Sequence, residues 1–516
     1  MDVRTIVSEV RSTYVSGRTK PLSWRLANLV ACRKMLEDNI EAWTAAVEAD
    51  TLKPRAEAQI GDVWVAQQEI NTMIRSVQAW MQPEHVATPA ALVPASSRIE
   101  KQPFGVTLVI APSNYPLQLA LCPLFGAIAA GNACVLKPSE QCPEVAQCLE
   151  AFVKAYLDPE AVRVLQGGAG MVQALLAERW DHIIFTGSER VGRIVAAAAA
   201  AHLTPTTLEL GGKCPVFVAD DVTEPIESIA YKLLWGRLLS GGQSCVAPEY
   251  VLLPKGLVRP LADKLVAHLA EAHGEDPKSS PHFGRVCSSH AASRIGGLLV
   301  GHGGRVVCGG VADPERRYVS PTIILDPSPA SRVMTEECFG PVLCLLGVDT
   351  LDEAMEYVQT KPTPLALYVF TSSQATARRV LDRVPSGNAL VNDVVVQFAS
   401  PALPFGGLGP SGMGALHGKF YFDACCQKRG VVTKGSGALT RALDLQVFLR
   451  APPYTRFNLA LGRLLMTKLP ILLPAHYGYK SLVLIFASLA LYTLYVCGVL
   501  VPSLRYLCQA ILEYTA

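Results

Sequence analysis

The chain has 516 residues, which is enough for two or three domains and excludes a single small binding module. Half of its residues are hydrophobic and 17% are charged, a composition that excludes a disordered protein. Its 46 basic and 44 acidic residues leave a net charge of +2. Because nucleic-acid-binding proteins need a basic surplus, we expect no nucleic-acid partner.

The first 80 residues are predicted to form a helical region. Residues 2–14 contain Asp2 and Glu9 and no apolar run, so they cannot form a secretory signal, and the bulk of the protein is expected in the cytosol. Apolar residues recur with helical spacing around Leu26 and Ile70, which predicts amphipathic helices. We therefore expect residues 1–80 to pack as helices on the domain that follows.

From residue 81 onward, short apolar strands alternate with helices, a pattern typical of βαβ units. Right-handed crossovers would join them into a doubly wound parallel sheet, with its ligand site beyond the carboxyl ends of the strands. Residues 81–208 are thus a predicted Rossmann-type nucleotide-binding domain. Its strands are expected at 105–111, 133–136, 162–165 and 182–186, and its helices at 117–130, 145–157, 171–178 and 191–202.

A second α/β domain is predicted for residues 209–397. After it, the glycine-rich run at 404–414 is expected to open a polar connecting arm, which we place at 398–450. An amphipathic helix is expected within a linker at 451–480. The strands of the second domain are expected near 215–218, 250–253 and 365–370.

The mean hydropathy of +0.27 is high for a soluble enzyme, and the apolar excess is concentrated near the C-terminus. Residues 481–501 read SLVLIFASLALYTLYVCGVLV, and a helix of this length spans roughly 30 Å, about one bilayer core. A buried core helix is the alternative, but such helices are usually shorter. The preceding flank carries more basic residues than the short tail at 502–516, so we predict a tail anchor with the large domains cytosolic.

The 15 cysteines are scattered without repeated spacing, which argues against a disulfide framework and for a reducing compartment. No HExxH motif or pair of CxxC motifs is present, so we expect no metal site. Most of the cysteines are expected to be inert core residues. These include Cys32, Cys122, Cys134, Cys148 and Cys344.

Two residues are candidates for catalysis. Cys245 lies in the string GGQSCVAP, on a predicted loop, although a structural cysteine is the alternative. Glu209 stands between Leu208 and Leu210, and this apolar setting would raise its pKa toward the range of a general base. A paired structural glutamate is the alternative for Glu209.

Two strand ends carry residues suited to a nucleotide. Gly187 and Ser188 join a strand to a helix that contains Gly192, and N–H groups at a helix N-terminus bind anions. Such a turn often serves only to cap the helix. Lys137 and Glu140 follow another strand, where they could hold ribose hydroxyls or simply face solvent.

Seven strings strongly resemble the aldehyde dehydrogenase superfamily. They are PFGVTLVIAPSNYP, GAIAAGNACVLKPSE, FTGSERVGR, LELGGKCP, GQSCVAPEYV, EECFGPV and LPFGGLGPSGMG, and they follow the family's order over roughly residues 20–430. The strings HLTPTTLELGGK and GMGALHGKFYFD are similar to the class 3 branch. The hydrophobic tail is similar to that of its microsomal, membrane-anchored fatty aldehyde dehydrogenases. The resemblance implies an aldehyde dehydrogenase-like fold and a homodimer, with the 398–450 arm bridging the subunits.

The resemblance also implies a role for each candidate residue. Cys245 would be the nucleophile, and Asn114 would stabilise the oxyanion together with the Cys245 backbone N–H. Glu209 would activate the water that hydrolyses the thioester. Lys137 and Glu140 would hold the adenosine ribose. The remaining cofactor contacts would come from Gly187, Ser188 and Gly192 near the pyrophosphate and from Glu337 and Phe339 at the nicotinamide.

The implied cofactor is NAD. Glu140 would repel the 2′-phosphate of NADP while Lys137 would attract it, so NAD is favoured and NADP remains possible. Two residues depart from the family pattern. Ser113 stands where Trp is common, and Gln397 stands where class 3 relatives often carry His. Both lie near the implied substrate path.

The leading hypothesis is NAD-dependent oxidation of medium- or long-chain aliphatic aldehydes at a membrane, with the endoplasmic reticulum as the expected location. Such aldehydes enter bilayers with about 0.8 kcal/mol per methylene, so an anchored enzyme meets them where they concentrate. One alternative is a short-chain or semialdehyde dehydrogenase whose anchor serves only localisation. A charged substrate would then require an extra Arg or Lys at the mouth of the site. The other alternative is a catalytically silent membrane adapter, against which the intact set of Cys245, Asn114 and Glu209 argues.

Overall fold

The computed structural model describes residues 2–89, 92, 95–437, 450, 452–463, 466–467 and 472–473. The chain divides into two units, one formed by residues 1–81 and 102–427 and the other by residues 82–101 and 428–516. The predicted anchor at 481–501 and the tail at 502–516 lie outside the described residues. Within the described part of the chain, no helix is both long enough and apolar enough to cross a bilayer.

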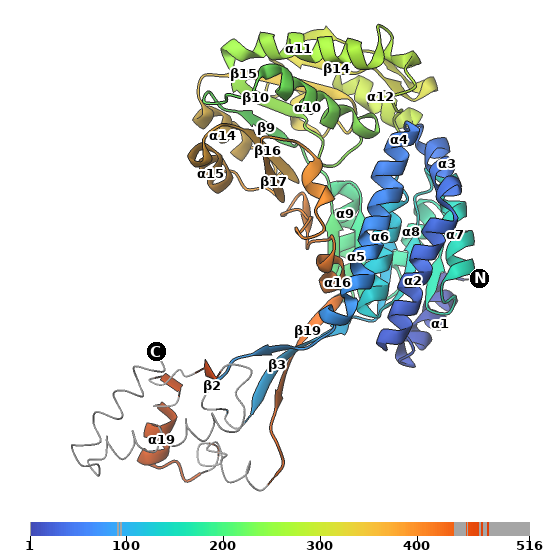
Figure 1. The fold of residues 1–516 in the computed structure, drawn as a ribbon, viewed down its shortest axis with the longest axis vertical. Coiled ribbons are helices and arrows are strands. Elements are labelled where there is room, and N and C mark those ends of the chain that lie inside the picture. The colour runs from blue at the N-terminus through green and yellow to red at the C-terminus, as the bar shows by residue number, and fades with distance from the viewer. Residues whose placement is uncertain are drawn as a thin grey trace, which may run out of the picture. The chain divides into compact units, whose positions relative to one another are not determined.

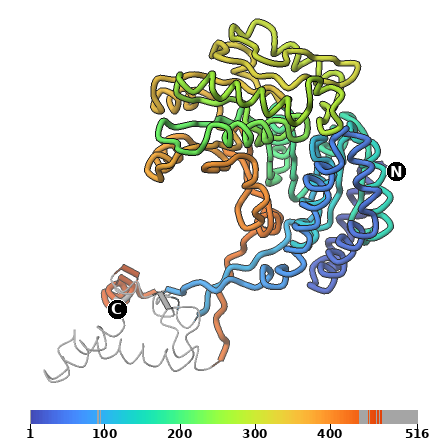
Figure 2. The backbone as a smooth tube through the Cα atoms, turned by 45° about the horizontal axis from the view of Figure 1, so that its top comes forward, coloured from blue at the N-terminus to red at the C-terminus, as the bar shows by residue number. Residues whose placement is uncertain are grey.

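The N-terminal region is helical, as predicted. Leu29 of α2 and Ile70 of α5 are fully buried, because the apolar stripes of these helices pack on a helix of the first sheet, α6. Figure 2 shows this helical layer, in blue, along one side of the first lobe. The elements are α1 (Val3–Val15), α2 (Leu22–Asp38), α3 (Ile40–Thr51), α4 (Arg55–Ala58), the π-helix η1 (Gln59–Trp64) and α5 (Val65–Trp80).

The first lobe is built on a six-stranded sheet of order β18-β8-β7-β4-β5-β6. All neighbouring strands from β6 to β8 are parallel, and their residues are mostly buried, as expected of strands covered on both faces. The predicted Rossmann-type sheet is therefore confirmed. Its strands are β4 (Val106–Ile110), β5 (Ala133–Lys137), β6 (Val162–Val164), β7 (His182–Thr186), β8 (Thr206–Glu209) and β18 (Gly412–Met413). Its helices are α6 (Gln118–Ala130), α7 (Pro143–Tyr156), α8 (Ala169–Leu176) and α9 (Glu189–Ala200).

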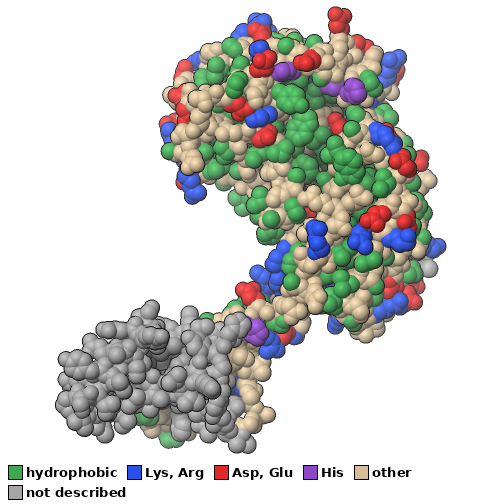
Figure 3. All heavy atoms as spheres, in the orientation of Figure 1, with side chains coloured by type: hydrophobic (Ala, Val, Ile, Leu, Met, Phe, Trp, Pro, Cys, Tyr) green, Lys and Arg blue, Asp and Glu red, His purple; other side chains and the backbone are tan. Residues whose placement is uncertain are grey.

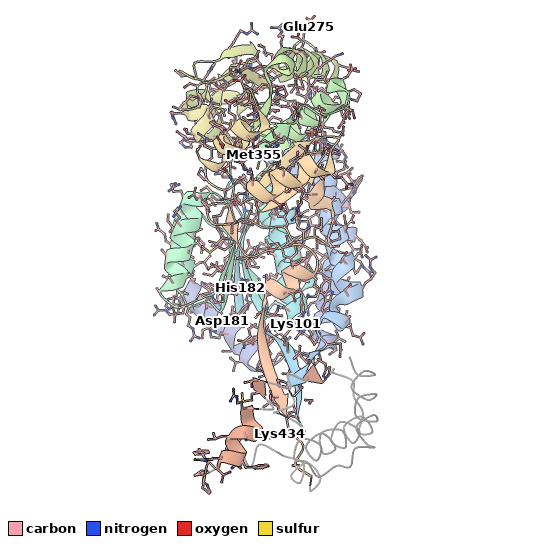
Figure 4. The ribbon with its side chains drawn as sticks, turned by 90° about the vertical axis from the view of Figure 1, so that its left-hand side faces the viewer. Lys101, Asp181, His182, Glu275, Met355 and Lys434 are labelled. Carbon is pink, nitrogen blue, oxygen red and sulfur yellow. The ribbon has the colours of Figure 1, made fainter. Side chains whose placement is uncertain are left out.

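The second lobe contains a seven-stranded sheet of order β11-β14-β15-β10-β9-β16-β17, in which only the edge strand β11 is antiparallel to its neighbour. Val216 joins the core on one face of this sheet and Phe217 the core on the other, because successive side chains alternate. In Figure 4, Met355 marks the second lobe and His182 the first. The strands are β9 (Pro215–Val218), β10 (Tyr250–Pro254), β11 (Arg305–Cys308), β14 (Thr322–Leu325), β15 (Val342–Val348), β16 (Ala366–Phe370) and β17 (Asn388–Val391). The helices are α10 (Ile226–Leu238), α11 (Lys255–His273), α12 (Ser289–Leu298), α13 (Arg332–Thr335), α14 (Leu351–Gln359) and α15 (Gln374–Arg383), and a small hairpin pairs β12 (Ala312–Asp313) with β13 (Tyr318–Val319).

The glycine-rich segment at 404–414 does not open a connecting arm, which corrects the sequence-based expectation. It returns to the first lobe, where β18 pairs antiparallel with β8 and places Gly412 opposite Glu209. A Cβ atom at Gly412 would lie 2.4 Å from the Leu208 carbonyl oxygen, so the pairing requires glycine. The next helix, α16 (Lys419–Ala424), then packs on α6. The segment has little hydrophobic periodicity, and therefore its sequence did not reveal this return.

The second unit joins two segments that are distant in sequence. Strands β1 (Glu84–Val86), β3 (Ser96–Pro103) and β19 (Cys426–Thr433) form a three-stranded sheet of order β1-β3-β19. Glu100 binds both Arg98 and Arg429, which links β3 to β19. Residues 82–101, which the sequence assigned to the nucleotide domain, therefore belong with the C-terminal segment. This unit also contains the pair β2 (Thr88–Pro89) and β20 (Leu472–Leu473) and the helix α19 (Arg456–Arg463), which lies within the predicted amphipathic helix.

Candidate active site

The carboxyl ends of the parallel strands bring the candidate residues of the first lobe to one edge of the sheet. The chain extends from β4 outward to β5 and β6, then crosses back to β7 and β8 on the other side of β4. The crevice at such a reversal, here between β4 and β7, is where open α/β sheets bind ligands. Asn114 follows β4, Lys137 ends β5, Gly187 and Ser188 follow β7, and Glu209 ends β8. Figure 1 labels α9, the helix that begins after Ser188.

The residues at this edge fit a dinucleotide. The buried Lys137 ammonium donates a hydrogen bond to the exposed Glu140 carboxylate. Burial is the largest single influence and would raise the pKa of Glu140, but the Lys137 hydrogen bond, a backbone hydrogen bond and the Lys137 charge together hold the pKa below its usual value. Ser188 precedes α9, and no side chain caps the N-terminus of that helix. Its first N–H groups are therefore available to an anion such as a pyrophosphate.

Gly192 has a different environment from the other predicted cofactor residues. A Cβ atom at this position would lie 2.6 Å from Leu210 Cδ2, so glycine allows α9 to pack closely on the chain after β8. The structure thus gives Gly192 a packing role, and its cofactor role stays a prediction.

Glu337 reaches from the second lobe to the chain that follows Glu209. Its Oε1 accepts a hydrogen bond from the Gly212 N–H at 3.1 Å, and a Cβ atom at Gly211 would lie 2.3 Å from the same oxygen. Desolvation, reinforced by the charge of Glu249, raises the pKa of Glu337 to about 7. Glycine at position 211 therefore makes room for this carboxylate beside the end of β8.

Glu249 holds the loop that carries Glu337 and Phe339. Its carboxylate accepts hydrogen bonds from the Cys338 N–H at 2.9 Å and the Phe339 N–H at 3.1 Å. It also pairs with Lys213 Nζ at 2.6 Å and Arg237 Nη1 at 3.5 Å. Although Glu249 is buried, these two cations hold its pKa below its usual range. Glu249 was not among the predicted site residues, and the available signal was an acidic residue directly before the apolar strand β10.

Cys245 follows a turn of unusual backbone geometry. The segment η3 (Leu239–Gly242) contains three successive left-handed residues, with φ values of 58° at Ser240, 62° at Gly241 and 81° at Gly242. Asn114 Nδ2 donates a hydrogen bond to the Gln243 carbonyl oxygen at 2.9 Å. The proposed oxyanion donor is thus attached to the chain two residues before the cysteine.

Burial raises the pKa values of both Cys245 and Glu209. Cys245 is half-buried, and desolvation followed by the charges of Glu209, Cys214 and Glu337 raises the pKa of its thiol well above the usual value. Burial alone raises the pKa of Glu209 well above its usual value, and its Oε1 has no hydrogen-bond partner among the described residues. A buried carboxyl group without a partner is a typical feature of functional sites.

A buried ion pair from the N-terminal helices supports the Asn114 loop. Lys53 Nζ lies 3.0 Å from Asp62 Oδ2 and 4.0 Å from the centroid of the Tyr115 ring. Asp62 Oδ1 accepts a hydrogen bond from the Leu117 N–H at 3.1 Å. No function was predicted for this region, because lysine and aspartate side chains are usually solvated surface groups.

The two residues that depart from the family pattern both lie at the site. Ser113 Oγ donates a hydrogen bond to Gln141 at 3.2 Å. Gln397 Nε2 donates to the buried Tyr368 hydroxyl at 3.3 Å, and that hydroxyl donates to the carbonyl oxygen of Val246. Gln397 therefore contacts the nucleophile loop through one intervening side chain.

A cavity of about 470 Å³ lies beside the turn that leads to Cys245. Leu239, within that turn, forms part of its wall. Tyr231 and Trp235 of α10 are 62% and 41% exposed, and Figure 3 shows hydrophobic side chains gathered on this face close to histidines. The full lining is Glu57, Tyr231, Leu234, Trp235, Leu238, Leu239, His268, Glu271, Ala272, His273 and His282.

Residues 1–431 match the family model described as "Aldehyde dehydrogenase family". The chain belongs to the aldehyde dehydrogenase family. It is 41% identical over 459 residues to "Aldehyde dehydrogenase family 3 comG" of Dictyostelium discoideum, which covers 89% of this chain and 96% of that protein. It is also 41% identical over 444 residues to "Aldehyde dehydrogenase family 3 member B1" of Homo sapiens, which covers 86% and 93% of the two chains.

Solved structures show the same relationship. The substrate-bound state of Staphylococcus aureus AldH superposes with a TM-score of 0.84 at 33% identity and covers 90% of this chain and 99% of that chain. A Mycobacterium tuberculosis aldehyde dehydrogenase complexed with NAD+ superposes with a TM-score of 0.76 at 25% identity, covering 84% and 90%. This aldehyde dehydrogenase thus has class 3 relatives, as the resemblance implied, and its structural neighbours include a complex with NAD+ and a complex with NADP.

Proposed function

We propose that this aldehyde dehydrogenase oxidises medium- and long-chain aliphatic aldehydes to carboxylic acids through a covalent intermediate on Cys245. The observation that supports this substrate class is the cavity beside the turn before the cysteine, whose wall includes the apolar side chains of Trp235, Leu238 and Leu239. Binding sites of small molecules are commonly clefts of about 300–1,000 Å³ with mostly apolar walls. A hydrocarbon chain suits such a wall because its burial is favourable without any polar partner.

The reaction begins at the Cys245 sulfur. The Cys245 thiol first releases its proton to solvent water, because only the thiolate is a strong nucleophile. The thiolate then adds to the aldehyde carbon, and the carbonyl oxygen becomes an oxyanion held by the Cys245 backbone N–H and by the Asn114 side chain. One Asn114 N–H is bound to the Gln243 carbonyl oxygen, which orients the amide and leaves its second N–H for the oxyanion. The product of this addition is a thiohemiacetal.

NAD, when bound, would supply the acceptor for the hydride that leaves the thiohemiacetal carbon, and a thioester on Cys245 would remain. Lys137 and Glu140 would hold its ribose, the N-terminus of α9 after Gly187 and Ser188 its pyrophosphate, and Glu337 and Phe339 its nicotinamide end. Glu209 then takes a proton from the water that attacks the thioester carbon, the carbon–sulfur bond breaks, and the acid leaves. The raised pKa of Glu209 suits this role because the carboxylate becomes a stronger base.

A semialdehyde substrate is the alternative with a specific structural requirement. Its second, negatively charged group would need a cation at the mouth of the site. Among the described residues that line the cavity there are two glutamates and three histidines but no Lys or Arg. This lining favours an uncharged chain.

The proposed enzyme is a homodimer attached to a membrane. The apolar segment at 481–501 would anchor the enzyme to the endoplasmic reticulum membrane with both lobes in the cytosol, where apolar aldehydes leave the bilayer. The class 3 relationship supports a homodimer. The silent-adapter alternative is disfavoured because Cys245, Asn114 and Glu209 are all present at one site.

The test is NADH production by the purified protein with a series of linear aldehydes from propanal to hexadecanal. We expect kcat/KM to rise with chain length, because each buried methylene contributes about 0.8 kcal/mol of binding. Cys245→Ala should abolish turnover while leaving NAD binding intact. A kcat/KM that is flat or falls with chain length would exclude the fatty-aldehyde assignment, and turnover by Cys245→Ala would exclude the covalent mechanism.

A further inference from the structure

The turn before Cys245 is held by a carboxylate from the N-terminal helices. Glu57 Oε2, on α4, accepts a hydrogen bond from the Ser240 N–H at 2.8 Å. Ser240 is buried, and its left-handed φ of 58° is a conformation that a serine keeps only when its surroundings fix it. The carboxylate thus satisfies a buried N–H donor in a strained part of the backbone.

Ser240 in turn contacts the proposed oxyanion donor. Its hydroxyl donates a hydrogen bond to the Asn114 carbonyl oxygen at 3.3 Å, and its own carbonyl oxygen accepts one from Gln243 Nε2 at 2.9 Å. Gln243 completes this hydrogen-bond network, because its carbonyl oxygen accepts a hydrogen bond from the Asn114 side-chain amide at 2.9 Å. A displacement of Ser240 would therefore move the nucleophile loop and the oxyanion donor relative to each other.

Residues near Glu57 also contact the Asn114 side of this hydrogen-bond network. Asp62 accepts the Leu117 N–H just after the Asn114 loop, and Lys53 pairs with Asp62 at 3.0 Å. The charge of Lys53 also acts on Glu57, where it opposes the effect of burial on the carboxyl pKa. Residues 53–62 thus contact both loops that meet at the reacting sulfur.

We propose that Glu57 is a positioning residue, which fixes the left-handed turn before Cys245 and thereby sets the distance between the nucleophile and the Asn114 oxyanion donor. The proposal rests on the proposed roles of Cys245 and Asn114. Glu57 acts through Ser240, so its substitution should affect the geometry of the transition state more than the binding of the aldehyde.

The test compares Glu57→Gln with Glu57→Met. Gln keeps a carbonyl oxygen that can accept the Ser240 N–H, whereas Met has a similar length and no strong acceptor. The assays use propanal, because Glu57 also lines the cavity proposed for longer chains. We expect Glu57→Met to lower kcat with propanal roughly 10- to 100-fold, the range that a small misplacement of reacting groups produces, with KM for propanal within about twofold of wild type. Glu57→Gln should keep kcat close to wild type. Glu315→Met, at an exposed carboxylate of the second lobe, is the control and should change neither parameter.

Three results would overturn the proposal: full kcat in Glu57→Met, an equal loss in Glu57→Gln, or a rise in KM at constant kcat. If Glu57→Met does not fold, Glu57→Asn replaces it, because its shorter amide cannot reach the Ser240 N–H, and the same comparison with Glu57→Gln decides. Turnover by Cys245→Ala would instead refute the proposed function. Mass spectrometry of iodoacetamide-treated Glu57→Met should still show alkylated Cys245. This result would show that the thiol is present and reactive, so that the loss of kcat comes from its position.

Discussion

At the scale of single residues, burial sets the chemistry of Glu209. Desolvation raises its folded-state pKa well above the ordinary value of 4.5. The Glu209 carboxyl therefore binds its proton more tightly in the folded protein than in the unfolded chain. Its contribution to the free energy of unfolding is fully present below pH 4.5, the ordinary pKa, and is lost as pH rises through the raised pKa of the folded state. The same ionisation is required of a general base, so activity should rise over the pH range in which stability falls.

Glu209→Gln should separate these two effects. The variant cannot ionise, so its melting temperature should exceed that of wild type by an increasing margin as pH is raised through the folded-state pKa. Its steady-state turnover should fall about 10²- to 10⁴-fold, the usual contribution of a general base, while the first burst of NADH persists. Thermal melts measure the melting temperature and stopped-flow absorbance measures the burst and turnover, each from pH 5 to 9.

Glu275→Gln, at an exposed carboxylate beyond the end of α11 (Figure 4), is the control. A constant melting difference across pH would show that Glu209 is not desolvated.

Sequence patterns predicted the residues that we propose to react, but not those that hold them in place. Cys245 and Glu209 departed from ordinary patterns through a loop cysteine and an acid in an apolar run. Glu57, Asp62 and Glu249 looked like ordinary surface acids, because their partners lie far away along the chain or are backbone N–H groups. Periodicity and motifs carry no signal for such hydrogen bonds.

At the scale of elements, the parallel strands were predictable and the last strand of the first sheet was not. Continuous apolar runs followed by helices indicated β4, β5, β6 and β7 within a few residues. Strand β18 has two residues, Gly412 and Met413, and its pairing with β8 depends on close backbone contact instead of apolar burial. The contact matters because it fixes the strand that ends in Glu209.

Gly412→Ala tests the importance of this pairing. The added methyl group would meet the Leu208 carbonyl oxygen at 2.4 Å, and backbone cannot yield as a flexible side chain can. We expect a loss of about 1–3 kcal/mol in the free energy of unfolding, measured by urea denaturation, together with a reduced kcat because Glu209 is displaced. Gly430→Ala, where a Cβ would meet no atom within 4 Å, should change the free energy by less than about 0.5 kcal/mol. Equal stability of the two variants would show that β18 can separate from β8 without consequence.

At the scale of the whole molecule, the reacting residues and the predicted anchor lie in different units. Every residue placed at the site lies within residues 53–397 of the first unit, whereas the apolar segment at 481–501 lies in the range of the second. The chemistry should therefore depend on the first unit, and delivery of apolar substrate on the C-terminal segment. These two contributions can be measured separately.

Deletion of residues 481–516 should move the enzyme from the membrane pellet to the supernatant and leave kcat with propanal unchanged. With hexadecanal supplied in phospholipid vesicles, the full chain should be faster than the deletion variant, because about 0.8 kcal/mol per methylene keeps this aldehyde in the bilayer. Propanal, which is mostly in water, should show no such difference and serves as the control.

If the variant still pellets with membranes, a second deletion from residue 452 tests whether α19, with Phe457 and Leu459 exposed, binds the membrane instead. Equal rates of the two proteins with hexadecanal would show that the segment does not deliver substrate, even if it anchors the chain.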